Sequence, residues 1–202
     1  CVERGLDPFK INLVVADPTR GGGAITLAAT PAIKQLGVPS RGRIYEIPKD
    51  IEYITATPRM TLYMKYSAKI YSIFLKFISS EDIHVYSIDE SFLDITSYLS
   101  LYKMNAKQLA KTIIDEIYNV TGITATVGIG TNLFLAKVAL DITAKHAKDF
   151  MGYLDEDLFK QLIWHHTPIT DVWMIGPGTA NRLASLGIKD LYGVAHYDEK
   201  IL

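Results

Sequence analysis

Hydrophobic side chains recur along this chain at spacings that predict both helices and strands. Residues 11–16 form a short apolar run that predicts a buried strand, and residues 27–36, followed by Gly37, predict a short helix. Across residues 59–78 apolar side chains recur every three or four positions with lysines between them, which predicts an amphipathic helix. By the same reasoning we expect helices over 105–118 and 132–142 and a strand over 124–129.

The middle of the chain has the pattern of a β-hairpin. Residues 83–88 and 92–95 are apolar runs that flank the polar triplet Asp89-Glu90-Ser91. From residue 83 onward the predicted order is strand, strand, helix, strand, helix. That order predicts an α+β fold in which helices cover one face of a sheet.

After residue 150 the pattern becomes helical. Short helices are predicted over 155–163 and 179–186, with a tight turn at Ile175-Gly176-Pro177-Gly178 between them. We therefore expect a small helical unit that begins near residues 165–168.

Composition narrows the class of protein. The chain has 202 residues, of which 49% are apolar and 21% charged, which excludes intrinsic disorder. A single cysteine excludes a disulfide framework, and no apolar run is long enough to cross a membrane. The first residues, Cys-Val-Glu-Arg-Gly, resemble neither a signal peptide nor a protein start, so we expect the chain to begin inside a longer protein.

The net charge of −1 argues at first against a partner as acidic as DNA. The charges are, however, unevenly distributed. Residues 1–80 carry 11 basic and 6 acidic side chains, whereas residues 81–102 carry five acidic side chains and no lysine or arginine. The average therefore hides a basic first part and an acidic segment around the hairpin.

Asp89 and Glu90 are the first candidates for chemistry. Neighbours in an ideal strand point to opposite faces, but at a hairpin turn two adjacent carboxylates can converge. Paired carboxylates suit Mg²⁺, and two such ions can stabilise an in-line phosphoryl transfer. Two solvated acids in a turn are the simpler alternative, although the lack of nearby basic residues leaves their repulsion uncompensated.

A second candidate is the junction Val127-Gly128-Ile129-Gly130-Thr131-Asn132, followed by Leu135-Ala136-Lys137. A strand that ends in glycines and leads into a helix capped by Thr131 or Asn132 can bind an anion, or can simply join the two elements. Lys145 follows the predicted helix. Its side chain could reach a triphosphate, or could complement the helix dipole.

The third candidate is the turn at Ile175-Gly176-Pro177-Gly178, which leads into a helix that carries Thr179 and Arg182. Backbone N–H groups at such a turn can hold DNA phosphates without reading the base sequence. The pattern is typical of a helix-hairpin-helix, and also of a plain turn between two helices.

Taken in this order, the motifs resemble those of the Y-family (translesion) DNA polymerases. The residues that carry the resemblance are Ser87-Ile88-Asp89-Glu90-x-Phe92-Leu93-Asp94-Ile95-Thr96, Val127-Gly128-Ile129-Gly130-x-Asn132-x-x-x-Ala136-Lys137-x-Ala139, and Ile175-Gly176 with Leu183 and Leu186-Gly187-Ile188. Residues 24–38 and 59–70 are similar to the family's fingers segment and to the helix that leads back to the palm. The sequence is most similar to the UmuC-like branch, the catalytic subunits of polymerase V.

The resemblance implies an α+β right-hand fold with a ferredoxin-like palm sheet, small fingers and a helix-hairpin-helix thumb. Fingers and the end of the first palm segment would occupy residues 1–60, the palm 61–165 and the start of the thumb 166–202, and the little finger would be absent. It also implies an error-tolerant, template-directed polymerase that bypasses DNA damage in the cytoplasm, away from any membrane. Primer-template DNA and a dNTP would be its substrates, and a sliding clamp and SOS accessory proteins would bind missing regions.

Site residues follow from the same resemblance. Asp89 and Glu90 would be catalytic carboxylates of a two-metal Mg²⁺ site in which Mn²⁺ can substitute. Lys34 and Lys145 would bind the nucleotide. The DNA backbone would be held by Gly176, Gly178, Thr179 and Arg182.

Several positions depart from the family's pattern. The first catalytic aspartate and the aromatic steric gate are missing, so we expect this polypeptide to be inactive alone. Pro31 and Lys34 stand where many members have tyrosine and arginine, and lysine keeps the charge but loses the bidentate grip. Lys145 aligns only with a shift of one residue. Met174 and Gly176 align with the two hairpin glycines, which leaves Gly178 without an assigned role.

Two other functions compete with the polymerase. A non-catalytic DNA-binding relative would keep the fold without the chemistry, and the sequence of the missing upstream segment would distinguish it. A nucleotidyl cyclase also uses paired acids on a palm-like sheet. It would not explain the turn at residues 175–178, or the similarity of residues 24–38 to the fingers segment of the polymerases. An unrelated α/β domain would require the motifs to occur together by accident.

Overall fold

The computed structural model describes residues 1–200, apart from the side chains of Val2 and His146. The chain divides into two compact units, Cys1–Met64 and Lys65–Leu202. The last two residues of the range expected for the thumb, 201 and 202, lie outside the described residues.

The first unit is built on a three-stranded sheet with the order β2-β1-β3. The central strand β1 (Leu13–Val15) runs antiparallel to β2 (Ala28–Ala29) and parallel to β3 (Ile54–Ala56). Val14 is fully buried, and the other buried members of this core are Ile33, Val38 and Ile47. The strand predicted over 11–16 is confirmed, and β3 was not predicted.

The helix predicted over residues 27–36 is wrong in its first half. Residues 28 and 29 form β2, and helix α1 (Pro31–Gln35) begins only after it. Thr30 explains the difference, because its hydroxyl donates to the carbonyl of Ile11 at 2.7 Å and accepts from the N–H of Leu13 at 3.1 Å. These bonds hold the segment extended beside β1, and Pro31 then begins the helix at the position where proline is tolerated.

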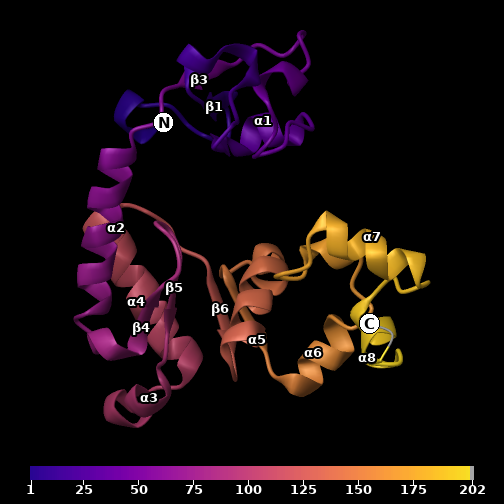
Figure 1. Cartoon of the computed structure of the whole chain (residues 1–202). Coiled ribbons are helices and arrows are strands. Elements are labelled where there is room, and N and C mark those ends of the chain that lie inside the picture. The colour runs from indigo at the N-terminus through magenta and orange to yellow at the C-terminus, as the bar shows by residue number, and fades with distance from the viewer. Residues whose placement is uncertain (201–202) are drawn as a thin grey trace. The chain divides into compact units, whose positions relative to one another are not determined.

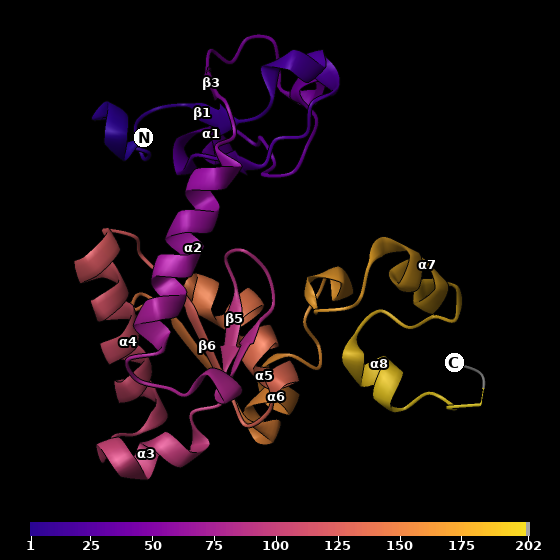
Figure 2. The same ribbon diagram turned by 60° about the vertical axis from the view of Figure 1, so that its left-hand side comes forward.

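One core of the second unit is built from a long helix, a β-hairpin and the helices that follow it. Helix α2 (Met60–Phe74) begins in the first unit and leads to the hairpin of β4 (Ile83–Val85) and β5 (Ser91–Leu93), which pair antiparallel. Helices α3 (Thr96–Tyr102) and α4 (Ala106–Thr121) follow. Figure 2 shows α4 beside α2 in this unit. The core side chains from these elements are Ile73, Ile78, Ile83, Leu109, Ile113 and Ile117.

A second pair of strands completes the sheet elements. Strand β6 (Val127–Gly130) runs parallel to β7 (Met151–Leu154), and α5 (Leu133–Val138) with a π-helical turn (Ala139–Thr143) connects them. Figure 1 shows α5 beside β6. The described strands of this unit pair as two separate two-stranded ladders, β4–β5 and β6–β7, rather than as one continuous sheet.

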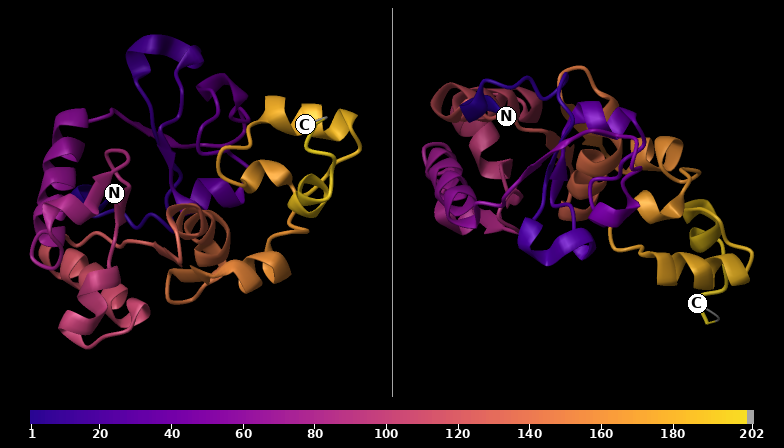
Figure 3. Two further views of the ribbon diagram at one scale, coloured as in Figure 1. Left: turned by 60° about the horizontal axis from the view of Figure 1, so that its bottom comes forward. Right: turned by 90° about the horizontal axis from the view of Figure 1, so that it is seen from above.

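The chain ends in three short helices, which form the orange-to-yellow end of the ribbon in Figure 3. They are α6 (Glu156–Leu162), α7 (Pro177–Ser185) and α8 (Leu191–Ala195). Ile169, Leu183 and Ile188 form the buried core around α7 and α8. Leu158 and Phe159 of α6 instead pack against a separate core made of Leu135, Val138, Ala139, Ile142, Leu154, Ile163 and Val172. The tight turn predicted at 175–178 is wrong in its second half. Gly176 is the N-cap of α7 and Pro177 its first residue, so Gly178 lies inside the helix.

The other predicted elements are present with shifted ends. The sequence missed α3, β7 and α8 as well as β3. Short 3-10 turns occur at Val2–Arg4, Pro18–Gly23, Ile44–Glu46, Ser80–Asp82, Ala144–His146 and Ile169–Asp171. Within the described residues, none of the helices has the length and apolar character needed to cross a membrane.

Candidate functional site

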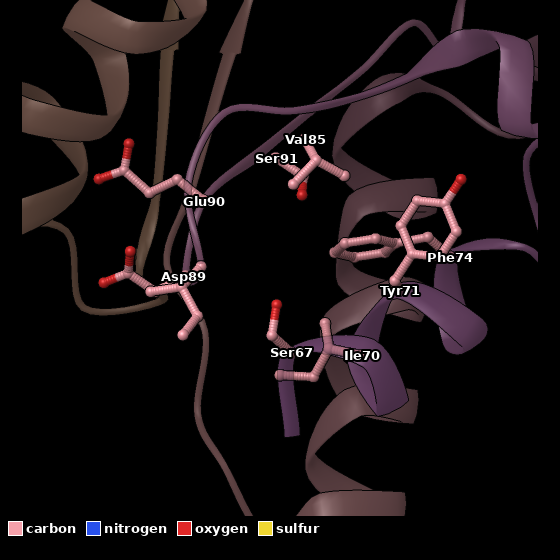
Figure 4. A pocket seen from close by; sticks show the side chains of 9 residues that line it. Ser67, Ile70, Tyr71, Phe74, Val85, Asp89, Glu90 and Ser91 are labelled. Atoms are coloured by element: carbon pink, nitrogen blue, oxygen red, sulfur yellow. The ribbon is translucent and has the colours of Figure 1, made fainter. Parts of the chain in front are cut away.

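The turn of the β4–β5 hairpin brings the two predicted carboxylates to one side. The N–H groups of Tyr86 and Ser87 both donate to the carbonyl of Glu90 at 3.0 Å, which folds the chain back immediately before β5. Asp89 accepts a hydrogen bond of 2.7 Å from the hydroxyl of Ser87. Figure 4 shows that the carboxylates of Asp89 and Glu90 are turned to the same side. The convergence that an ideal strand would forbid is therefore achieved by the turn.

Glu90 is held by a lysine from a different element. The ammonium group of Lys137, on α5, donates to Oε2 of Glu90 at 2.7 Å and to Oδ1 of Asp141 at 3.1 Å. Only 7% of the Lys137 side chain is exposed, against 36% for Glu90. The Lys137 nitrogen also lies 5.9 Å from the centre of the Tyr86 ring. The hairpin and α5 are thus joined by a mostly buried ion pair.

The electrostatics of Lys137 favour its charged form. Burial by itself lowers the pKa of a lysine, but the hydrogen bonds to Glu90 and Asp141 and the charges of both carboxylates outweigh burial and raise the pKa of Lys137. The ammonium group is therefore a permanent cation beside Glu90 at neutral pH.

A small pocket lies on the other side of the hairpin. Ser67, Ile70, Tyr71 and Phe74 of α2 line it together with hairpin residues 85 and 88–91, which include Asp89 and Glu90. Figure 4 shows the α2 side chains on one side of the hairpin and the two carboxylate groups turned away from them. The carboxylates therefore face away from this apolar lining.

Asp89 and Glu90 fit part of a divalent-cation site. Their oxygens are the hard ligands that Mg²⁺ prefers, and Asp89 is exposed and Glu90 half-buried. In the part of the chain that the structure describes, no group of three or more His, Cys, Asp or Glu side chains is placed to hold a metal ion. At this turn the described residues therefore offer two carboxylates, fewer protein ligands than a closed two-metal site requires.

The two lysines expected at the nucleotide lie on separate elements. Lys34 is exposed on α1 in the first unit, whereas Lys145 is exposed in the 3-10 turn that follows the π-helical turn in the second unit. The hydrogen bonds of the described residues link neither lysine to Asp89 or Glu90. Their role at a nucleotide stays a prediction.

The turn before α7 has the backbone of a tight hairpin. Met174, which aligns with the first hairpin glycine of the family, has a φ of 73°, in the left-handed region that favours glycine. Gly176 is the N-cap of α7, and Thr179 and Arg182 lie on the helix. Arg182 is exposed, and a Cβ atom added at Gly176 or Gly178 would meet nothing within 4 Å. This turn and the first residues of α7 are thus accessible.

Close packing against α5 and the turn that follows it accounts for the glycines of β6. A Cβ atom at Gly128 would lie 2.8 Å from the Cα atom of Leu140 and would overlap the carbonyl oxygen of Ala136. One at Gly130 would lie 2.6 Å from the carbonyl carbon of Leu135. The side chain of Asn132 caps α5 by accepting from the N–H of Leu135 at 2.9 Å. These contacts fix α5, and hence Lys137, against the sheet.

Sequence reasoning missed the roles of Lys137 and Asp141. Lys137 was part of the second motif, but nothing in its spacing connects it with Glu90, 47 residues earlier. The available signal was the acidic segment without lysine or arginine, because such a segment favours a nearby cation, either a bound metal ion or a basic side chain from another part of the chain.

The sequence profile of the impB/mucB/samB family matches residues 2–141, about two thirds of the chain. The chain belongs to the impB/mucB/samB family. Among curated proteins, the chain is similar to a putative UV-damage repair protein, UvrX, of Bacillus subtilis. It is 32% identical over 202 residues, which cover 100% of this chain and 47% of the relative. DNA polymerase IV 2 of the same organism is 33% identical and covers 100% and 48%. The chain spans about half the length of these two relatives.

Solved structures agree with the family assignment. DinB from Sulfolobus solfataricus is 27% identical, with a TM-score of 0.75 over 98% of this chain and 57% of that one. An insertion ternary complex of Dbh DNA polymerase is 26% identical, with a TM-score of 0.78 over the same shares. The expected α+β polymerase fold is confirmed, and the impB/mucB/samB chain is a Y-family polymerase relative.

Proposed function

We propose that the protein containing this chain is a template-directed DNA polymerase that copies damaged templates, and that residues 1–202 supply its fingers, its palm and the start of its thumb. The domain boundaries that we propose are 1–60, 61–165 and 166–202. The observation that supports the proposal most is the pair of carboxylates at the hairpin turn. They face one side, in a chain whose family profile and structural neighbours belong to polymerases.

Asp89 and Glu90 would hold a divalent cation, Mg²⁺ or Mn²⁺. When bound, such an ion polarises phosphoryl oxygens and neutralises charge that develops at the reacting phosphate. Asp89 keeps the hydroxyl of Ser87 as its hydrogen-bond donor, which restricts its carboxylate, and Glu90 is held by Lys137. These two constraints would present the carboxylate pair in one arrangement before an ion arrives.

Binding of the substrates would fall to basic and backbone groups. Lys34 and Lys145 would contact the triphosphate of the incoming dNTP. The N–H groups of Gly178 and Thr179, near the N-cap Gly176, together with Arg182, would contact the phosphates of primer-template DNA, since backbone donors at a helix start suit anions without reading sequence. A sliding clamp and SOS accessory proteins would bind parts of the parent protein outside residues 1–202.

The 202-residue chain by itself should extend primers poorly or not at all, because its described residues supply two carboxylates and no third ligand beside them. Primer extension with Mg²⁺ by the parent protein tests the function. Asp89→Asn in the parent should lower the rate at least about a hundredfold, as expected when electrostatic stabilisation of the reacting centre is lost. Asp157→Asn, on the surface of α6, is the control and should leave the rate unchanged.

Two results would contradict the proposal. Efficient Mg²⁺-dependent extension by residues 1–202 would show that no further ligand is needed. A parent protein that binds primer-template DNA but incorporates no nucleotide would instead be the non-catalytic relative, and formation of a cyclic nucleotide would identify a cyclase.

A further inference from the structure

We propose that Lys137 is a positioning residue for Glu90. Its ammonium group fixes one carboxylate oxygen of Glu90, so that the other oxygen and the Asp89 carboxylate form a preset pair for one divalent cation. The inference rests on the proposed function, because it takes Asp89 and Glu90 as the ligands of that cation.

Burial distinguishes Lys137 from other paired lysines of the chain. Lys160 donates to Glu156 at 2.8 Å, almost the same length as the 2.7 Å bond from Lys137 to Glu90. The Lys160 side chain is 43% exposed, however, and that of Lys137 only 7%. A charge-assisted bond shielded from water is stronger and holds both side chains in one conformation, whereas an exposed pair contributes little.

Lys137 is itself held in place. Asp141, one helical turn further on, accepts a second bond from the ammonium group at 3.1 Å. The backbone that carries Lys137 packs directly on Gly128 and Gly130 of β6, so α5 has no room to move towards the sheet. Because the position of the Lys137 ammonium group is fixed, it determines the conformation that the Glu90 side chain adopts in the hydrogen bond.

A role in positioning and a role in charge balance predict opposite effects when Lys137 is neutralised. Lys137→Met removes one positive charge beside the carboxylates, and this change by itself would tighten cation binding. Loss of the hydrogen bond from Lys137 would free the Glu90 side chain. Cation binding would then be weaker, because the entropy cost of ordering the Glu90 side chain would oppose association. The sign of the change in affinity therefore separates the two roles.

Manganese binding to the 202-residue chain provides the test, with free Mn²⁺ measured by electron paramagnetic resonance. We expect Lys137→Met to weaken binding about tenfold, as is typical when a partner of a metal ligand is lost. Lys137→Gln keeps an N–H donor without the charge, and should bind Mn²⁺ more tightly than Lys137→Met. The control Lys160→Met should bind as the unmodified chain does. Equal or tighter binding by Lys137→Met would overturn the proposal.

A second measurement needs no metal. Side-chain scalar couplings of Glu90 should show one χ1 rotamer in the unmodified chain and an average of rotamers in Lys137→Met and in Lys137→Gln, with the larger averaging in Lys137→Met. Averaging in the unmodified chain would overturn the positioning role. If Asp89→Asn leaves Mn²⁺ binding unchanged, the proposed metal site fails, and the rotamer result still decides the role of Lys137. Should Lys137→Met not fold, Lys137→Gln carries both readouts.

Discussion

The indole nitrogen of Trp173 donates a hydrogen bond of 3.3 Å to the hydroxyl of Tyr86, 87 residues earlier in the chain. Trp173 precedes α7, and Tyr86 begins the turn that carries Asp89 and Glu90. The Trp173 ring also lies 6.2 Å from that of Phe92 and 6.5 Å from that of Phe134. The segment that leads into α7 is therefore attached to the hairpin and to α5 by an aromatic cluster.

Trp173→Ala should lower the free energy of unfolding by about 2 kcal/mol, less than for a fully buried aromatic because Trp173 is half-buried. Trp173→Phe keeps ring contacts and loses the hydrogen bond, so its cost should be about 0.5 kcal/mol. Denaturant unfolding measures both values. Tyr118→Ala, at a side chain that is 55% exposed, is the control, and an equal cost at both positions would refute the cluster's contribution.

Gly128→Ala should destabilise the chain by about 3 kcal/mol or prevent folding, because the added methyl group overlaps the backbone of α5. Gly178→Ala adds the same group where nothing lies within 4 Å, inside α7, and should be neutral or slightly stabilising. Thermal unfolding of the two variants side by side checks the difference. Equal melting temperatures would contradict the close packing of α5 on β6.

Asp190 should make stability depend on pH. The hydrogen bond from the N–H of Gly193, and after it the bond with His165, lower the pKa of Asp190 from its usual 3.8. A lowered pKa means that the ionised form stabilises the fold above pH 3.8 and that this contribution is lost as the pH falls through the lower, folded-state value.

Asp190→Asn keeps the cap on α8 but removes the charge. It should therefore melt at a lower temperature than the unmodified chain at pH 7, and the two melting temperatures should converge as the pH falls below 3.8. When His165 is also replaced, by His165→Gln, Asp190→Asn should lower the melting temperature at pH 7 by a smaller amount. A penalty that is constant across this range would show that ionisation of Asp190 does not contribute.

Arg182→Gln should weaken binding of duplex DNA and lower the slope of its salt dependence by about one, the change expected when one phosphate contact is lost. Fluorescence anisotropy of labelled duplex DNA at several salt concentrations measures both quantities. Lys160→Gln removes a positive charge that is already paired with Glu156 and is the control. The same slope for Arg182→Gln and the unmodified chain would exclude Arg182 from the proposed DNA contact.

The sequence predicted the elements whose apolar pattern is regular. The hairpin around Asp89 and Glu90 and the helices α2 and α4 follow from spacing alone. Residues 27–30 were misassigned because tertiary bonds from Thr30 to β1 override local propensity. Strand β7 was missed because Gly152 interrupts its pattern, although a Cβ there would lie 2.6 Å from the carbonyl oxygen of Ala139.

The sequence indicated the two carboxylates of the candidate site, but not the residues that hold them in place. Asp89 and Glu90 stand out because two acids separate apolar runs, and their turn geometry follows from the hairpin. The bond from Lys137 to Glu90 joins residues 47 positions apart on different elements, and only the folded chain places them together. Met174 shows a similar limit, since nothing in methionine predicts a left-handed backbone.

The contact of α5 with β6 also bears on how this sequence can vary. Where helix and strand touch through glycine backbone, no neighbouring side chain can shrink to accommodate a larger residue, so compensating substitutions are unavailable. Random mutagenesis with selection for a folded product should therefore return almost no replacements at positions 128 and 130. Accepted replacements should be common at Gly23 and Gly176, where a Cβ meets open space.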